Sequence, residues 1–150
     1  MRVVAGKVKG RNLDSPKDRG VRPTSDRVRE AIFNALYSID AIENARVLDL
    51  FAGSGALGIE ALSRGSAHAV FVEKSSVNAQ LIERNIEKCG LSSQAEIHAR
   101  DGVTWLASNP GPWDLVLLDP PYQFDGWENL FQVLDAQVVV VESNREISPG

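Results

Sequence analysis

The order of apolar and polar positions predicts alternating strands and helices from residue 46 onward. Short apolar runs bounded by glycine, proline or polar residues have the length of buried strands, and longer segments with apolar residues three or four positions apart have the period of helices. The predicted strands are 46–51, 68–73, 94–99, 113–119 and 137–142, and the predicted helices are 56–64, 76–89, 102–108 and 127–134. Near-continuous apolar strands that alternate with helices indicate an α/β fold, a doubly wound and mostly parallel sheet covered on both faces.

The first forty residues carry a different pattern. Residues 2–13 predict a short strand pair punctuated by two glycines, and residues 14–23 form a polar loop that contains two prolines. Apolar positions then recur at helical spacing from Val28 to Ile39, so we expect a helix that opens near Thr24 and Ser25, either of which can cap its free amides.

Composition and length are those of a single globular domain. The chain has 150 residues, of which 43% are hydrophobic and 24% charged, and no apolar run approaches the roughly 20 residues that span a bilayer. The N-terminus has no apolar signal core, so we expect a cytoplasmic protein without a membrane partner. A single cysteine, Cys89, excludes an internal disulfide, and with only His68 and His98 beside it the sequence predicts no metal site.

Charge is distributed unevenly along the chain. Residues 1–30 carry nine Lys or Arg and four Asp or Glu residues, a balance of +5, whereas the remaining 120 residues carry a balance of −9. A basic segment on an acidic body is typical of proteins that bind a polyanion, although a solvated, flexible terminus would show the same composition. Charge alone leaves these two interpretations open.

Four predicted strands have an acidic residue at or near their ends: Asp49, Glu73, Asp101 and Asp119. In a doubly wound sheet the ligand lies beyond the carboxyl ends of the strands. One carboxylate at a strand end is ordinary, but four along the same edge predict a binding site there.

A glycine-rich turn follows the first of these strands. Gly53-Ser-Gly55-Ala-Leu-Gly58 matches the G-x-G-x-x-G pattern, and its position between a strand and a helix predicts a bound nucleoside cofactor. A pyrophosphate favours a helix N-terminus without nearby negative charge, whereas Asp49 lies only four residues before Gly53. A carboxylate there suits S-adenosylmethionine (SAM), which carries an ammonium, a carboxylate and a sulfonium.

The next two strand-end acids fit the same cofactor. Glu73 can accept hydrogen bonds from both ribose hydroxyls, but a ribose-binding acid also occurs in dinucleotide enzymes, so Glu73 does not discriminate between the cofactors. Asp101 can accept from the adenine amino group, and it is an equally good cap for the helix that follows it.

The predicted strand 113–119 runs into the turn Asp119-Pro-Pro-Tyr122. Two prolines fix φ and end the strand sharply, so Asp119 and the Pro120 carbonyl are held as acceptors beside the flat ring of Tyr122. This set fits an exocyclic amine on a planar base. Two acceptors hold the amine hydrogens, the ring stacks on a base removed from its helix, and Asp119 takes the proton once the nitrogen is cationic. The alternative is a proline-rich loop with a core tyrosine.

Together these motifs resemble a known family. DLFAGSGALG at 49–58 with the turn at 119–122 resembles class I methyltransferases that modify exocyclic base amines. RPTSDRVREAIFN at 22–34, preceded by VAGKVKGR at 4–11, is similar to the bacterial 16S rRNA guanine-N2 methyltransferase family. The resemblance implies a Rossmann-like, seven-stranded, SAM-dependent enzyme whose substrate is the small ribosomal subunit. It implies one domain with a basic extension and helix over 1–40 and a cofactor-binding and catalytic core over 45–142.

The resemblance also implies roles for individual residues. The expected catalytic residues, which hold the target amine, are Asp119, Pro120, Pro121 and Tyr122. The expected cofactor-binding residues are Asp49, Phe51, Gly53, Ser54, Gly55, Glu73, Lys74, Asp101, Gly102, Thr24 and Arg27. Within this set the resemblance implies that Asp49, Gly53 and Gly55 bind the methionine end of SAM. It implies that Glu73 binds the ribose and that Asp101 and Gly102 bind the adenine. The expected RNA-binding residues are Lys7, Lys9, Arg11 and Arg22.

The chain departs from the family pattern after Glu142. The family fold continues there with a helix and a closing antiparallel strand pair, so we expect the final edge strands to be missing and the strand 137–142 to have an open edge. An exposed β-branched edge, here Val138–Val141, pairs readily with another chain. We therefore expect a monomer only where that edge is complete.

Three other functions compete with guanine-N2 methylation. An adenine-N6 DNA or RNA methyltransferase can use the same turn, because an acidic or amide residue before Pro-Pro-aromatic serves both amines. A chain of 150 residues leaves little room for a DNA-recognition domain. A non-catalytic RNA-binding module would keep the fold without needing the intact turn at 119–122. A nicotinamide oxidoreductase is disfavoured by Asp49.

Overall fold

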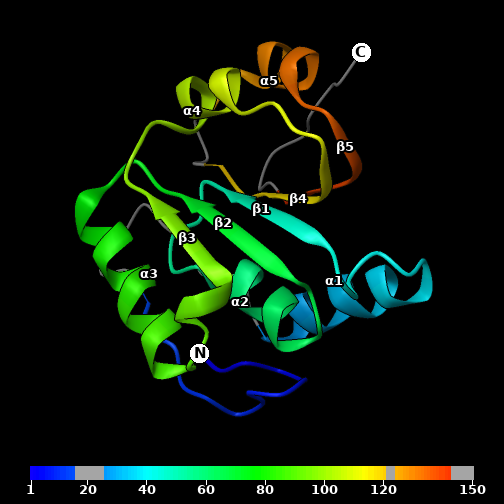
Figure 1. Cartoon of the computed structure of the whole chain (residues 1–150), viewed down its shortest axis with the longest axis vertical. Helices are drawn as coiled ribbons and strands as arrows, with labels where there is room; N and C mark the ends of the chain where they lie inside the picture. Colours follow the sequence, from blue (N-terminus) through cyan, green and yellow to red (C-terminus); the bar gives the residue numbers. More distant parts are fainter. Residues whose placement is uncertain (16–25, 121–123, 143–150) are drawn as a thin grey trace.

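The computed structural model describes residues 1–15, 26–120 and 124–142, and within these ranges the chain forms a sheet of five parallel strands (Figure 1). They are β1 (Arg46–Leu50), β2 (His68–Val72), β3 (Ala95–His98), β4 (Trp113–Leu118) and β5 (Ala136–Val141), in the order β3-β2-β1-β4-β5. The chain moves outward from β1 to β3 and then crosses to β4 on the other side of β1. The prediction of a doubly wound parallel sheet is confirmed, and the reversal between β1 and β4 marks where such sheets bind ligands.

Helices precede and connect the strands. They are α1 (Asp26–Ser38), α2 (Ala56–Ser63), α3 (Ser76–Lys88), the 3₁₀ turn η1 (Ser92–Gln94), α4 (Gly102–Ser108) and α5 (Trp127–Val133). Each element predicted between residues 46 and 142 is present, with bounds that differ from the prediction by one residue at most. Of the seven strands that the resemblance implies, the described residues form five. In the same ranges, none of the helices combines the length and apolar character needed to cross a membrane.

Alternate residues of the strands enter two separate cores. Val47 and Phe71 pack with buried residues of α1, α2 and α3, whereas Leu48 and Val72 pack with buried residues of α4 and α5. Figure 1 shows α1–α3 gathered on one side of the sheet and α4 and α5 on the other. Because β1, β2 and β4 are buried on both faces, they read as nearly continuous apolar runs in the sequence.

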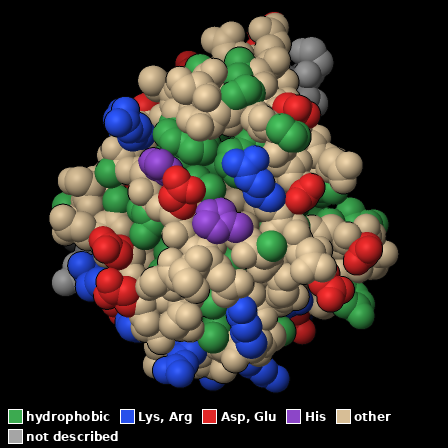
Figure 2. Space-filling view, viewed as in Figure 1, with side chains coloured by type: hydrophobic (Ala, Val, Ile, Leu, Met, Phe, Trp, Pro, Cys, Tyr) green, Lys and Arg blue, Asp and Glu red, His purple; other side chains and the backbone are tan. Residues whose placement is uncertain are grey.

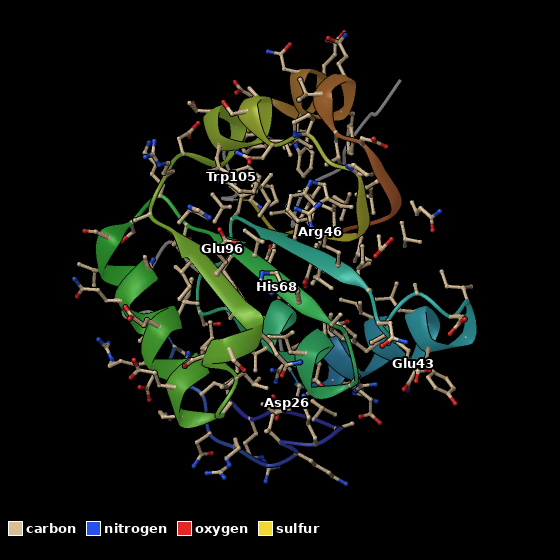
Figure 3. The ribbon with its side chains drawn as sticks, viewed as in Figure 1. Asp26, Glu43, Arg46, His68, Glu96 and Trp105 are labelled. Carbon is tan, nitrogen blue, oxygen red and sulfur yellow. The ribbon has the colours of Figure 1, made fainter. Side chains whose placement is uncertain are left out.

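The face under α4 and α5 is covered only over its centre. On β5 the side chains of Val139 and Val141 are 36% and 39% exposed, and β5 pairs with β4 alone among the described residues. At the opposite edge His68 and Glu96 lie side by side on the open sheet, with Nε2 and Oε2 3.6 Å apart (Figure 3). The prediction that both faces are covered is wrong for the edge strands, because two helices of seven residues each do not reach across five strands.

Residues 1–15, here called the N-terminal arm, pack onto the body of the protein. The predicted strand pair is reduced to a single antiparallel bridge between Arg2 and Asn12, because the turns at the two glycines occupy the residues between them. Val3 and Leu13 are 2% and 4% exposed and belong to the core formed with α1–α3. The interpretation as a solvated, flexible terminus is therefore wrong for this part of the basic segment.

Candidate active site

The glycine loop turns sharply from β1 into α2. Phe51 has a φ of 64°, a left-handed backbone that is uncommon for an aromatic residue, and Gly53 and Gly55 follow with φ of 60° and 79°. The Ala52 amide donates to the Val72 carbonyl at 3.0 Å, which ties the loop to the end of β2. The turn thus brings the first amides of α2 to the carboxyl edge of the sheet, where strained backbone often marks a ligand site.

Asp49 lies beneath this loop. Its side chain is 1% exposed, and its Oδ2 accepts from the Gly58 amide at 3.0 Å, so it satisfies one of the free amides in the first turn of α2. A Cβ at Gly58 would overlap the Phe71 ring, so this close approach requires glycine. Burial raises the pKa of Asp49 well above its usual value; the Gly58 bond opposes the rise, and the negative charges of Asp119 and Glu73 add to it.

Glu73, which directly follows β2, holds the other side of the loop. Its Oε1 accepts from the Gly53 amide at 2.9 Å, and its Oε2 accepts from the Ser75 amide at 2.9 Å. Ser75 in turn caps α3, because its hydroxyl accepts from the Asn78 amide at 3.2 Å. Each carboxylate oxygen has a second acceptor position, so Glu73 can receive two ribose hydroxyls while it holds the loop.

The first turn of α4 forms the next part of the edge. Asp101 caps this helix: its Oδ2 accepts from the amide of Thr104 at 3.0 Å and from the hydroxyl of Thr104 at 2.9 Å. This is the capping role that the sequence allowed. Gly102 is buried against Phe51, where a Cβ would come within 2.9 Å of the ring. The carboxylate of Asp101 therefore stands close to a small apolar surface.

Phe51, an expected cofactor-binding residue, contacts the segment after β4 through Phe124, which sequence reasoning missed. The rings of Phe51 and Phe124 have centroids 5.0 Å apart, and Phe124 meets Trp127 edge-on at 5.1 Å. Phe124 comes two residues after Tyr122, and that closeness was the only signal in the sequence. Its contact with Phe51 joins the glycine loop to the segment that leads into α5.

The end of β4 lies beside the glycine loop. Leu118 pairs with Leu50 in the parallel register, so Asp119 and Phe51 leave neighbouring strands at the same edge of the sheet. Asp119 is half-buried and Pro120 is buried, whereas Pro121 and Tyr122 lie outside the described residues. Because Asp119 and Glu73 both act electrostatically on Asp49, three of the four predicted acids share one region.

The other predicted cofactor residues have different surroundings. Ser54 is buried in the loop, where its hydroxyl accepts from the Ala56 amide at 3.3 Å. Lys74 is exposed next to Glu73, and Arg27 is exposed on α1. Thr24, and Arg22 of the predicted RNA-binding set, lie outside the described residues.

The remaining RNA-binding candidates, Lys7, Lys9 and Arg11, are exposed on the arm and are called the arm cations below. Figure 2 shows Lys and Arg side chains gathered at the lower end of the molecule, where the arm lies in Figure 1. The Lys7 ammonium donates to the Gln94 side chain at 2.9 Å. Exposed cations on a packed segment are suited to contact a phosphate backbone.

A family model described as "Conserved hypothetical protein 95" matches residues 1–147. The chain belongs to this family. The "Ribosomal RNA small subunit methyltransferase D" of Escherichia coli (strain K12) is 36% identical over 153 residues, which are 97% of this chain and 76% of that protein. The protein of the same name from Haemophilus influenzae is 38% identical over 138 residues, 89% of this chain and 70% of that protein. A solved structure of the yhhF protein of Escherichia coli has a TM-score of 0.84 at 35% identity and covers 99% of this chain and 84% of that chain. The family resemblance read from the motifs is confirmed.

Proposed function

We propose that this chain is a SAM-dependent methyltransferase that methylates the exocyclic N2 amine of a guanine in 16S rRNA. One arrangement carries the proposal. The glycine loop is held by the Glu73 carboxylate, and Asp119 follows the end of β4, the strand that pairs with β1. The relatives named as small-subunit rRNA methyltransferases support the substrate class. Residues 45–142 form the cofactor-binding and catalytic core of this cytoplasmic enzyme, and residues 1–40 form its basic N-terminal extension and helix.

The groups at the sheet edge fit SAM better than a dinucleotide. Glu73 accepts from the loop at Gly53, and the negative charges of Glu73 and Asp119 both act on Asp49 beneath the loop, which disfavours a pyrophosphate. The carboxylates of Asp49 and Glu73 suit an ammonium group and ribose hydroxyls. The surface of Phe51 and Gly102 beside Asp101 suits an adenine ring with its amino group. When bound, SAM supplies a methyl group activated by its sulfonium.

The turn after β4 binds and orients the guanine amine. Asp119 and the Pro120 carbonyl accept the two amine hydrogens, which orients the nitrogen and returns electron density to a lone pair that is otherwise delocalised into the ring. Asp119 takes one proton after the nitrogen has become cationic, so no strong base is required. Tyr122 stacks on the extruded base and keeps its plane fixed.

A substrate panel with identification of the nucleoside tests this proposal. Labelled SAM and the protein are incubated separately with unmodified small subunits, naked 16S rRNA, tRNA and DNA, and the methylated nucleoside is identified by mass spectrometry. Labelled N2-methylguanosine confined to the small subunit or its rRNA supports the proposal. N6-methyladenine in any of the four substrates would indicate the adenine enzyme, and no label in any of them would indicate a non-catalytic RNA-binding module; both overturn it.

A further inference from the structure

We infer that Asn85 is a positioning residue that couples RNA binding at the N-terminal arm to cofactor binding at the glycine loop. The inference rests on the proposed function, because it requires RNA at the arm cations and SAM at the loop. Asn85 belongs to α3 and its side chain is 0% exposed. A fully buried amide on an otherwise apolar helix face needs hydrogen-bond partners, and its partners come from both segments.

The amide group of Asn85 joins the arm to the loop directly. Its Oδ1 accepts from the Asp14 amide at 2.8 Å, and its Nδ2 donates to the Asp14 carbonyl at 3.0 Å. The side chain therefore binds both backbone polar groups of Asp14. The same Nδ2 donates to the Ser54 carbonyl at 2.9 Å. Both amide hydrogens are then used, so a shift of either segment disturbs the bond to the other.

A second anchor holds the beginning of the arm. Glu60 on α2, also 0% exposed, accepts from the amides of Val4 at 2.9 Å and Ala5 at 3.1 Å. The arm cations lie in the sequence between this anchor and Asp14. Phosphate contacts made by these cations therefore act on a segment that is tied at one end to α2 and at the other end to Asn85.

The hydrogen bond from Asn85 reaches the part of the glycine loop that we propose binds the cofactor. Asn85 fixes the carbonyl of Ser54, and Glu73 fixes the amide of the adjacent Gly53. An arm held by RNA thus favours the loop conformation that receives the cofactor. By linkage, the cofactor must tighten RNA binding by the same factor.

Coupling is measured as the ratio of affinities for in vitro transcribed 16S rRNA with and without saturating S-adenosylhomocysteine. We expect a ratio of about 5 or more for the wild-type chain and below about 2 for Asn85→Ala. Lys88→Met is the matched control, because it removes the 3.2 Å ion pair between Lys88 and Asp14 and leaves Asn85 in place; it should keep the wild-type ratio. Equal ratios in wild type and Asn85→Ala, or a ratio near unity in wild type, would overturn the inference.

Hydrogen exchange in the unaltered chain tests the same coupling without a substitution. S-adenosylhomocysteine should slow exchange of the Asp14 amide severalfold, whereas the Val3 amide, bonded to the Arg11 carbonyl within the arm at 3.0 Å, should keep its rate. Unchanged exchange at Asp14 overturns the inference. Failure to bind S-adenosylhomocysteine or RNA would count against the proposed function, whereas independent binding of both would count against the coupling alone.

Discussion

Replacement of Glu73 by alanine should remove most of the affinity for the cofactor. With the ribose-binding role proposed above, the variant loses two charge-assisted hydrogen bonds, at about 1.5–3 kcal/mol each. Their sum, about 3–6 kcal/mol, corresponds to a rise in Kd of roughly 10²- to 10⁴-fold. The amides of Gly53 and Ser75 also lose their acceptor, so the loop itself loosens and the loss should lie above the lower bound.

The isosteric change Glu73→Gln should be nearly as damaging. One carboxylate oxygen becomes an NH₂ group, which must face either the Gly53 amide or the Ser75 amide, donor against donor. Size and shape hardly change, so a loss of affinity in this variant reports on hydrogen bonding and not on packing.

Calorimetric titration with S-adenosylhomocysteine measures the effect. Glu83→Gln is the matched control, because Glu83 is an exposed acid on α3 and its replacement removes the same charge. A Glu73→Ala variant that is folded and binds with wild-type affinity would refute the ribose-binding role. An equal loss in Glu83→Gln would show that the net charge of the region, and not the placement of Glu73, controls affinity.

Three further changes test other parts of the site. Asp119→Ala should keep affinity for S-adenosylhomocysteine and slow single-turnover methyl transfer by about 10²–10³-fold, and unchanged kinetics would refute its role. Neutralising the arm cations together with Arg22 should weaken RNA binding and reduce the slope of log affinity against log salt by roughly one for each phosphate-binding side chain replaced; an unchanged slope would exclude the arm as the RNA-binding surface. Asp49→Asn should raise the free energy of unfolding at pH 7. The folded-state pKa of Asp49 is raised, so wild-type stability falls as pH rises above the unfolded value of about 3.9. Denaturant titrations from about pH 4 upward should show the gap between the two proteins widening, and a constant gap would contradict this reasoning.

The order of strands and helices could be predicted because it is determined by local features of the sequence, namely apolar runs and helix caps. The central strands β1, β2 and β4 are buried on both faces and read as unbroken apolar runs, and two of the following helices start behind the caps Ser75 and Asp101. The edges could not be predicted in the same way. Val139 and Val141 are as apolar as their neighbours, but their exposure depends on how far α4 and α5 reach across the sheet.

The site residues could be predicted as a set because strand-end carboxylates and a glycine turn have recognisable types and positions. The hydrogen-bond partner of each of these residues within the protein could not be predicted. Asp49 accepts from the Gly58 amide in α2 and Glu73 accepts from the Gly53 amide in the loop, and both contacts depend on the path of the chain from β1 into α2. Asn85 was missed because a lone asparagine on an apolar helix face looks like a small interruption, and its partners Asp14 and Ser54 lie 71 and 31 residues away.

The methylated product is the most direct test of the proposed function. Wild-type protein and Asp119→Ala are each incubated with labelled SAM and unmodified small ribosomal subunits, and the 16S rRNA is then digested to nucleosides for mass spectrometry. We predict labelled N2-methylguanosine with the wild type and a much slower appearance of the same nucleoside with Asp119→Ala. Label in a different nucleoside, or equal labelling by the two proteins, would contradict the assignment of guanine-N2 methylation to this site.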